Sequence, residues 1–303
     1  MDVVPALPVT QEPTPPSTLI LPHEIICTII HACGDDLSLL HAWSLVSPAC
    51  FAEVQPYLYR ELVFTGQSPL DITSQGGGRC LGWSRTYLFL DSTRHKPELL
   101  RFVRHLTIEL KQGVWPATMW AAFLKVFPSM TGLKHFRLDI TYSTYPHVVS
   151  LEALFPSSSM KLKELSLSIP DMLSAYFHDL PQILQHQQEL EELDLIGCHW
   201  EVPAISMDAC PNLHTISTWS LRCIEVMVPG RPVVKLCWDL SQPHLHRLSY
   251  ENLADSRFAC QALSQIRILV LRGPHASDRL AVIAPYLLLV EVLDLEDSNI
   301  CAA

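Results

Sequence analysis

Charge, glycine and long apolar runs are all scarce in this sequence of 303 residues. Only 17% of the residues are charged and only 11 are glycine, which excludes a collagen-like chain and a charge-rich disordered one. The longest uncharged apolar run extends only from 280 to 290 and contains Pro285, whereas a membrane-spanning helix needs roughly 20 apolar residues. Since 49% of the residues are hydrophobic, we expect a folded protein with a large core and no transmembrane helix.

Positive charge is also in short supply. The formal net charge is −10 and no cluster of Lys or Arg interrupts the acidic balance, so we expect neither nucleic acid nor an anionic membrane as a partner. A secretory signal peptide is not indicated, because Asp2 replaces a basic segment and prolines interrupt the first apolar stretch. We therefore expect an intracellular protein, cytoplasmic or nuclear.

The 10 cysteines lack any Cys-x-x-Cys pair, and most have apolar neighbours. They are interpreted as reduced core residues. Cys27, Cys33 and His31 come closest to a zinc-binding set, but structural zinc usually takes four ligands with paired spacing. We expect no metal and no cofactor.

Motifs of enzymatic chemistry are absent as well. The sequence has no Gly-x-Ser-x-Gly elbow, no phosphate-binding Gly-x-x-x-x-Gly-Lys and no His-Glu-x-x-His. Its histidine pairs are interpreted as solvated or capping residues, and its closest carboxylates as a charged strand face without a shielded cleft. We expect no enzyme and no catalytic residues. The groups considered are His244 with His246, His178 with His186, and Glu191 with Glu192 and Asp194.

Proline and glycine divide the chain into four parts. Residues 1–18 contain five prolines, which prevent a helix or ladder, and we expect a disordered leader. Residues 19–64 have a helical pattern, and the glycine-rich stretch 65–82 is expected to be a linker. The remainder, 83–303, contains a recurring apolar motif.

The pattern in 19–64 predicts three short helices. Pro22 suits a first helical turn, and the isoleucines that follow it form one apolar stripe. Gly34 ends this helix, Asp36 with its neighbouring aspartate can cap the second, and Ser47 before Pro48 can cap the third. A unit of this size is only marginally stable on its own. The high apolar content of its first helix therefore indicates that a partner buries part of the isoleucine stripe.

These residues carry a resemblance to a known family. Leu21-Pro22-His23-Glu24-Ile25-Ile26 with Ile29-Ile30, followed by Leu45-Val46-Ser47 and Phe51, resembles the F-box, and 57–64 is similar to the segment that follows it in many fungal members. The resemblance implies docking on a Skp-type adaptor that belongs to a cullin ubiquitin ligase. The residues expected to face the adaptor are Leu21, Pro22, Ile25, Ile26, Ile29 and Val46.

The strongest sequence signal is a six-residue phrase whose first, fourth and sixth positions are apolar. Its alternation predicts one strand per phrase, with one face buried. The phrase at 245–250 fits the pattern but lies too close to its neighbour, and we leave it open. The phrases occur at 103–108, 133–138, 162–167, 190–195, 213–218, 233–238, 266–271 and 290–295.

A repeat of this length resembles leucine-rich repeats, and Leu190-x-x-Leu193-x-Leu195-x-x-Cys198 matches their full phrase. Since the other units lack the Cys198 equivalent, we expect an irregular horseshoe: an α/β solenoid with a curved parallel sheet inside and helices outside. Phe64 is expected to supply a preceding strand. Helices are expected at 83–90, 117–127, 171–187, 256–264 and 277–289, the last with a kink at Pro285.

If the phrases are inner strands, alternate residues point to the concave face, which becomes the candidate surface for a protein target. Trp219, expected to be an exposed aromatic, resembles the composition of binding hot spots. Any solvated strand face also carries polar residues, so a purely structural role stays open. The candidates are His105, His135, Arg137, Asp139, Glu164, Glu192, Asp194, Trp219, Arg272 and Asp294.

The combined expectation is a substrate-recognition adaptor of a Skp-cullin-F-box ubiquitin ligase, whose solenoid binds an unknown protein target. The alternative is a structural or recognition solenoid without a ligase, whose first helices cap an exposed repeat. A hydrolase hidden in an irregular fold is the third hypothesis.

Overall fold

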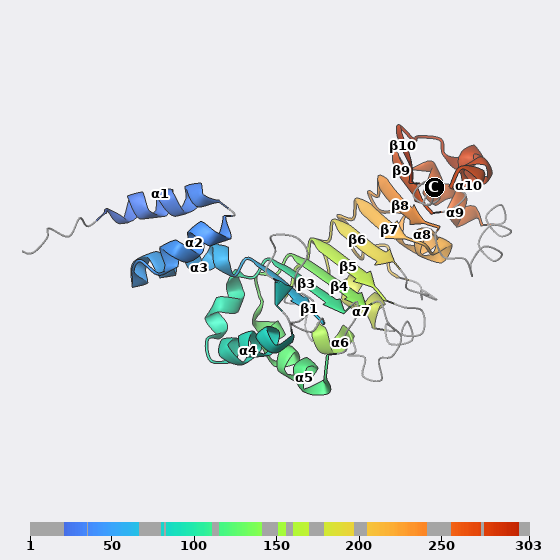
Figure 1. Ribbon diagram of the computed structural model, residues 1–303. Helices are drawn as coiled ribbons and strands as arrows, with labels where there is room; N and C mark the ends of the chain where they lie inside the picture. Colours follow the sequence, from blue (N-terminus) through green and yellow to red (C-terminus); the bar gives the residue numbers. More distant parts are fainter. Residues whose placement is uncertain are drawn as a thin grey trace, which may run out of the picture. The chain divides into compact units, whose positions relative to one another are not determined.

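The computed structural model describes residues 21–34, 36–66, 80–81, 83–110, 115–140, 151–155, 160–169, 179–196, 205–240, 256–273 and 276–296. The chain divides into two compact units, Met1–Val54 and Gln55–Ala303. The expected leader 1–18 lies outside the described residues, as does most of the expected linker 65–82. Both units are drawn in Figure 1.

The first unit contains α1 (His23–Cys33), α2 (Leu37–Ser44) and most of α3 (Pro48–Leu58). These three helices occupy the positions that the sequence predicts. Their apolar faces meet in a small core, in which Ile30, Leu40, Cys50 and Val54 are at most 2% exposed.

Short-range polar contacts define where these helices begin and end. Gly34, at φ 57°, follows α1 in a backbone region that favours glycine. The Asp36 carboxylate accepts hydrogen bonds from the backbone N–H groups of Ser38 and Leu39 at the start of α2. Ser47 Oγ accepts from the Cys50 N–H at the start of α3. Each contact satisfies a backbone group that has no partner within its helix.

The second unit is an α/β fold with one open, ten-stranded sheet in which every strand pair is parallel. The strand order is β10-β9-β8-β7-β6-β5-β4-β3-β1-β2, so from β3 onward each strand lies beside its neighbour in sequence. The strands are β1 (Glu61–Thr65), β2 (Cys80–Leu81), β3 (His105–Leu110), β4 (His135–Ile140), β5 (Glu164–Ser168), β6 (Glu192–Ile196), β7 (Thr215–Thr218), β8 (Lys235–Asp239), β9 (Ile268–Arg272) and β10 (Val292–Glu296).

The strand register follows the apolar phrase. In each of the eight expected phrases a strand begins at the third residue, and the fourth residues align across the sheet. Phe64 lies in β1, which pairs with β3, as expected. The sheet thus begins within the range 19–64, and the open phrase at 245–250 lies outside the described residues. The aligned residues are Leu106, Phe136, Leu165, Leu193, Ile216, Leu236, Leu269 and Leu293.

Within the second unit, the described helices lie along one side of the sheet (Figure 1). Short 3-10 segments follow several of them, and Pro285 lies in such a segment rather than in a kinked helix. The helices of this layer are α4 (Trp83–Arg94), α5 (Ala117–Val126), α6 (Leu151–Leu154), α7 (Leu180–Gln185), α8 (Leu221–Met227), α9 (Arg257–Ser264) and α10 (Ala276–Ile283); the 3-10 segments are η2 (Pro97–Phe102), η3 (Phe127–Ser129) and η6 (Ala284–Tyr286).

The core lies between the sheet and this helical layer. Alternate residues of β3 are buried, Leu106, Ile108 and Leu110 being at most 1% exposed, while the residues between them are partly exposed. This alternation is what a strand with one covered face requires. Within the described residues, no helix has the length and apolar character needed to cross a membrane.

Candidate binding surfaces

The first candidate surface is a set of exposed apolar side chains on the first unit, the exposed apolar area. While Ile30 and Leu40 are buried, Ile25 is 46% and Val46 is 65% exposed. Large apolar side chains that stay in water on a unit this small are candidates for burial by a partner. Among the described residues of the unit, the exposed large apolar ones are Leu21, Ile25, Leu39, Leu45, Val46 and Phe51.

The residues expected to face an adaptor lie at the surface to different degrees. Leu21, Pro22, Ile25 and Val46 are exposed, and Ile26 and Ile29 are half-buried. The isoleucine stripe of α1 is therefore divided, because Ile30 closes the core and Ile25 faces solvent. Sequence reasoning missed Leu39, Leu45 and Phe51, since a leucine or phenylalanine on a short helix is more often a core residue.

The second candidate surface is the face of the sheet opposite the described helices. The residues of this face alternate with the core residues, and the parallel register aligns them in rows that cross the strands. The first row contains His105, His135, Glu164 and Glu192. The rings of His105 and His135 stack with centroids 4.2 Å apart, and His135 Nδ1 lies 2.9 Å from Glu164 Oε2.

Burial and the neighbouring charge of His135 lower the pKa of His105. Glu61 and Glu164 act in the opposite direction, and Arg60 adds to the lowering. The first row is therefore a line of hydrogen-bonding groups, in which the stacked imidazoles lie beside the Glu164 carboxylate.

The second row contains Arg137, Ser166 and Asp194. Ser166 is buried, and its hydroxyl donates to Asp194 Oδ2 at 3.0 Å. The other carboxylate oxygen, Asp194 Oδ1, is buried and has no hydrogen-bond partner among the described residues. Burial raises the pKa of Asp194, and the Ser166 hydrogen bond and the Arg137 charge only partly offset this effect. A buried carboxylate oxygen that lacks a donor makes the ionised form of Asp194 costly.

The third row includes Asp139, Arg272 and Glu296, and some of these side chains already pair with neighbouring side chains. Arg272 on β9 donates two hydrogen bonds to the Glu296 carboxylate on β10. Its Nε lies 2.8 Å from Oε2, and its Nη2 lies 3.3 Å from Oε1. Asp139 is 8% exposed and lies 3.9 Å from Arg137. Of the expected target-binding residues, Arg137, Glu192 and Asp294 are exposed, whereas His105, His135, Glu164, Asp194 and Arg272 are half-buried.

The expectation that Trp219 is an exposed hot spot is wrong. Trp219 follows β7 and is only 6% exposed, and its carbonyl accepts a hydrogen bond from Trp238 Nε1 at 3.2 Å. At the end of a strand the alternation no longer fixes the direction of a side chain, so counting by twos fails there.

Among the described residues, two of the carboxylates considered for catalysis already have partners. Glu191 forms an ion pair with Lys163 at 2.8 Å. The Asp194 carboxylate accepts a hydrogen bond from Ser166, and burial is the largest cause of its raised pKa. His186 caps α7 and is exposed. The remaining candidate histidines, 178, 244 and 246, lie outside the described residues.

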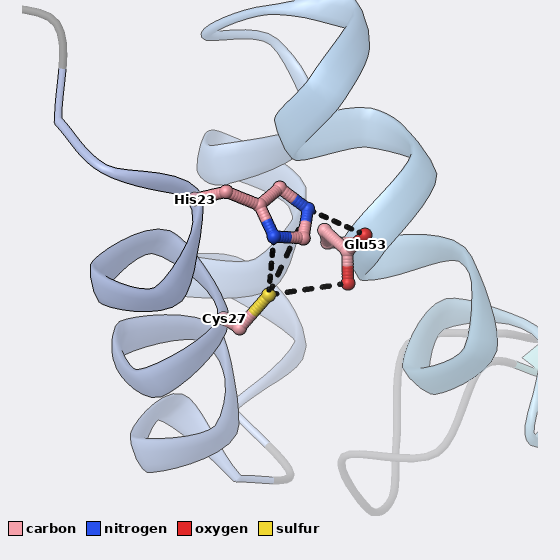
Figure 2. Close-up of side chains that lie close together, drawn as sticks. All are labelled: His23, Cys27 and Glu53. Atoms are coloured by element: carbon pink, nitrogen blue, oxygen red, sulfur yellow. Dashed lines mark hydrogen bonds and ion pairs between the residues drawn. The ribbon is translucent and has the colours of Figure 1, made fainter.

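One cluster of metal-ligand side chains occurs in the described part of the chain. His23, Cys27 and Glu53 bring one ligand atom each to within 4.8 Å of one another (Figure 2). Cys33 and His31, which sequence reasoning grouped with Cys27, are not part of this cluster. The four-residue spacing of His23 and Cys27 is visible in the sequence and places both on one helix face. Glu53 belongs to another helix, so the sequence near His23 and Cys27 does not indicate that it joins them.

A scan of the chain against models of known protein families finds no match, and a search of curated proteins also finds none. The proposed function therefore rests on the two candidate surfaces and the cluster of metal-ligand side chains.

Proposed function

We propose that this protein is a non-catalytic adaptor whose first unit is an F-box that docks on a Skp-type subunit of a cullin ubiquitin ligase. Its second unit, a leucine-rich-repeat-like solenoid, binds the protein to be modified. The protein would accelerate transfer only by holding the target near a conjugating enzyme carried by other subunits.

The exposed apolar area of the first unit is the observation that carries this proposal. Fully burying one Val, Leu or Ile side chain contributes about 1.5–3 kcal/mol. Ile25 is 46% and Val46 is 65% exposed, so about half of this contribution is still to be gained at each residue. The area contains the Leu-Pro-x-Glu-Ile and Val-Ser segments that resemble the F-box. The core of the same unit is already closed by Ile30, Leu40 and Val54. Partner binding thus accounts for apolar residues that folding leaves in water.

Target binding is assigned to the face of the sheet opposite the described helices. Its rows combine both signs of charge, because they contain Arg137 and Arg272 together with Glu164, Glu192 and Asp194. A protein surface with complementary lysine, arginine and carboxylate groups matches such a mixture. A polyphosphate does not, because Glu164, Glu192 and Asp194 would repel it.

A reconstitution with the full chain tests the docking step. The immobilised chain should retain a purified Skp-type adaptor together with its cullin, and Ile25→Asp should abolish retention of both, because it places a charge in an apolar interface. Leu288→Asp is the matched control, since Leu288 is an exposed leucine of the second unit.

The same experiment discriminates the alternative solenoid without a ligase. If the first helices served only as a cap, neither adaptor nor cullin would be retained by the unaltered chain. Equal retention by Ile25→Asp and Leu288→Asp would also reject the proposed docking surface.

A further inference from the structure

We propose that His23, Cys27 and Glu53 form a binding site for one zinc ion that links α1 to α3. The inference is independent of the adaptor function, and it replaces the expectation that the chain binds no metal. All three residues belong to the first unit.

The geometry fits one small tetrahedral ion. His23 Nε2 lies 3.1 Å from Glu53 Oε1 and 3.9 Å from Cys27 Sγ, and Cys27 Sγ lies 3.5 Å from Glu53 Oε2. Zinc bonds of about 2.0–2.3 Å at tetrahedral angles place ligand atoms about 3.3–3.6 Å apart. The three side chains converge from two helices, as Figure 2 shows, and small rotations would point one atom of each at a shared centre.

The donor set selects the metal. A thiolate, an imidazole and a carboxylate together favour zinc over calcium or magnesium, which prefer oxygen ligands alone. Three protein ligands leave a fourth corner open, and the His23 side chain, 61% exposed, places the site at the surface, where water can complete the tetrahedron. The site is thus of the open, three-ligand kind.

Binding exchanges a proton for the metal. In the metal-free cluster the Cys27 thiol donates a hydrogen bond to Glu53 Oε2. Zinc would form a bond to Cys27 Sγ while the thiol proton leaves to solvent, and no electron is transferred. The carboxylate that held the thiol proton then becomes a metal ligand.

The site would stabilise a marginal element of the fold. The first unit is small, and Glu53 lies 30 residues from His23 along the chain, so the metal would join the first helix to the third. Because the site requires the folded arrangement, zinc should raise the thermal stability of this unit, by an amount that grows with the logarithm of the free zinc concentration once that concentration exceeds the Kd.

Zinc titration of the full chain tests the proposal. The reduced, chelator-treated protein is titrated with Zn²⁺ against a chromophoric competitor, and one equivalent should bind. Cys27→Ser and Glu53→Gln should each weaken this binding by about 100-fold or more, since removing even groups behind the ligands costs about 10–100-fold. Cys33→Ser is the matched control, because Cys33 lies on the same helix and is also half-buried but lies outside the cluster.

Cobalt supplies a second readout that does not depend on affinity. Co²⁺ in the unaltered chain and in Cys33→Ser should give thiolate-to-cobalt charge-transfer absorption and the strong visible bands of a tetrahedral site, and Cys27→Ser should lose both. Circular dichroism checks that each variant is folded. The proposal is overturned if the unaltered chain takes up no stoichiometric zinc, or if Cys27→Ser binds it as tightly as Cys33→Ser. Either result would leave the cluster as a hydrogen-bond network only.

Discussion

The imidazole rings of His105 and His135, on neighbouring strands β3 and β4, lie 4.2 Å apart and within 5° of parallel. Protonation of both rings would place two positive charges in contact. Since burial and the charge of His135 lower the pKa of His105, the stack is most stable when His105 is neutral.

Acidification should therefore destabilise the second unit through His105. With a folded-state pKa below the ordinary value of 6.5, the unfolded chain takes up the proton first as pH falls, and stability is lost between pH 6.5 and that lower value. Denaturant unfolding at several pH values should show this loss in the unaltered chain and less of it in His105→Gln. His41→Gln, a change at an exposed histidine of α2, should leave the profile as it is. Identical profiles for all three proteins would contradict the assignment.

Removing the neighbouring charge gives a direct check on the cause. His135→Gln should move the pKa of His105 upward, because one of the two effects that lower it most is then gone. NMR titration of the His105 ring protons measures the shift. An unchanged titration midpoint would mean that burial alone sets this pKa.

Replacing Asp194 with asparagine should stabilise the protein at neutral pH. The pKa of Asp194 is raised by burial, so its contribution to stability falls as pH rises through the window from the ordinary 3.8 to the raised value, and the ionised form is a cost above it. Asparagine removes the charge and keeps an oxygen that accepts from Ser166. Asp294→Asn is the control, because Asp294 is the aligned but exposed residue of β10. Lower stability of Asp194→Asn than of Asp294→Asn would contradict this account.

The two faces of β4 should respond differently to truncation. Phe136 is 1% exposed and its ring packs against Phe127 and Phe155, so Phe136→Ala should cost about 3–5 kcal/mol of unfolding free energy. Arg137, the next residue, faces outward, and Arg137→Ala should change stability by no more than about 0.5 kcal/mol. Chemical denaturation measures both. Similar losses would mean that the register or the face assignment is wrong.

The sheet could be predicted because its signal is local and repeated. Each phrase encodes an alternation over a few residues, and parallel strands joined by returning helices then stack the phrases in order. Leu106, Phe136, Leu165 and Leu193 align across four strands because they hold the same position in their phrases. The helix caps at Asp36 and Ser47 were equally local.

Contacts between distant segments could not be predicted in this way. Arg231 is buried and donates hydrogen bonds to the carbonyls of Ser206, Ala209 and Met227, yet nothing near it in the sequence indicates burial. Trp219 was misjudged because its direction depends on packing beyond the strand end. The cluster of His23, Cys27 and Glu53 arises only when α1 packs against α3. Such sites depend on tertiary packing, for which one sequence carries no periodic signal.

The most direct test of the adaptor account is calorimetric measurement of the affinity between the full chain and a purified Skp-type adaptor. The account predicts binding with one adaptor per chain, weakened about 30-fold or more by Val46→Asp, since a central interface residue contributes about 2 kcal/mol or more. Leu288→Asp should bind as the unaltered chain does. Absence of binding by the unaltered chain, or equal affinities for Val46→Asp and Leu288→Asp, would contradict the account.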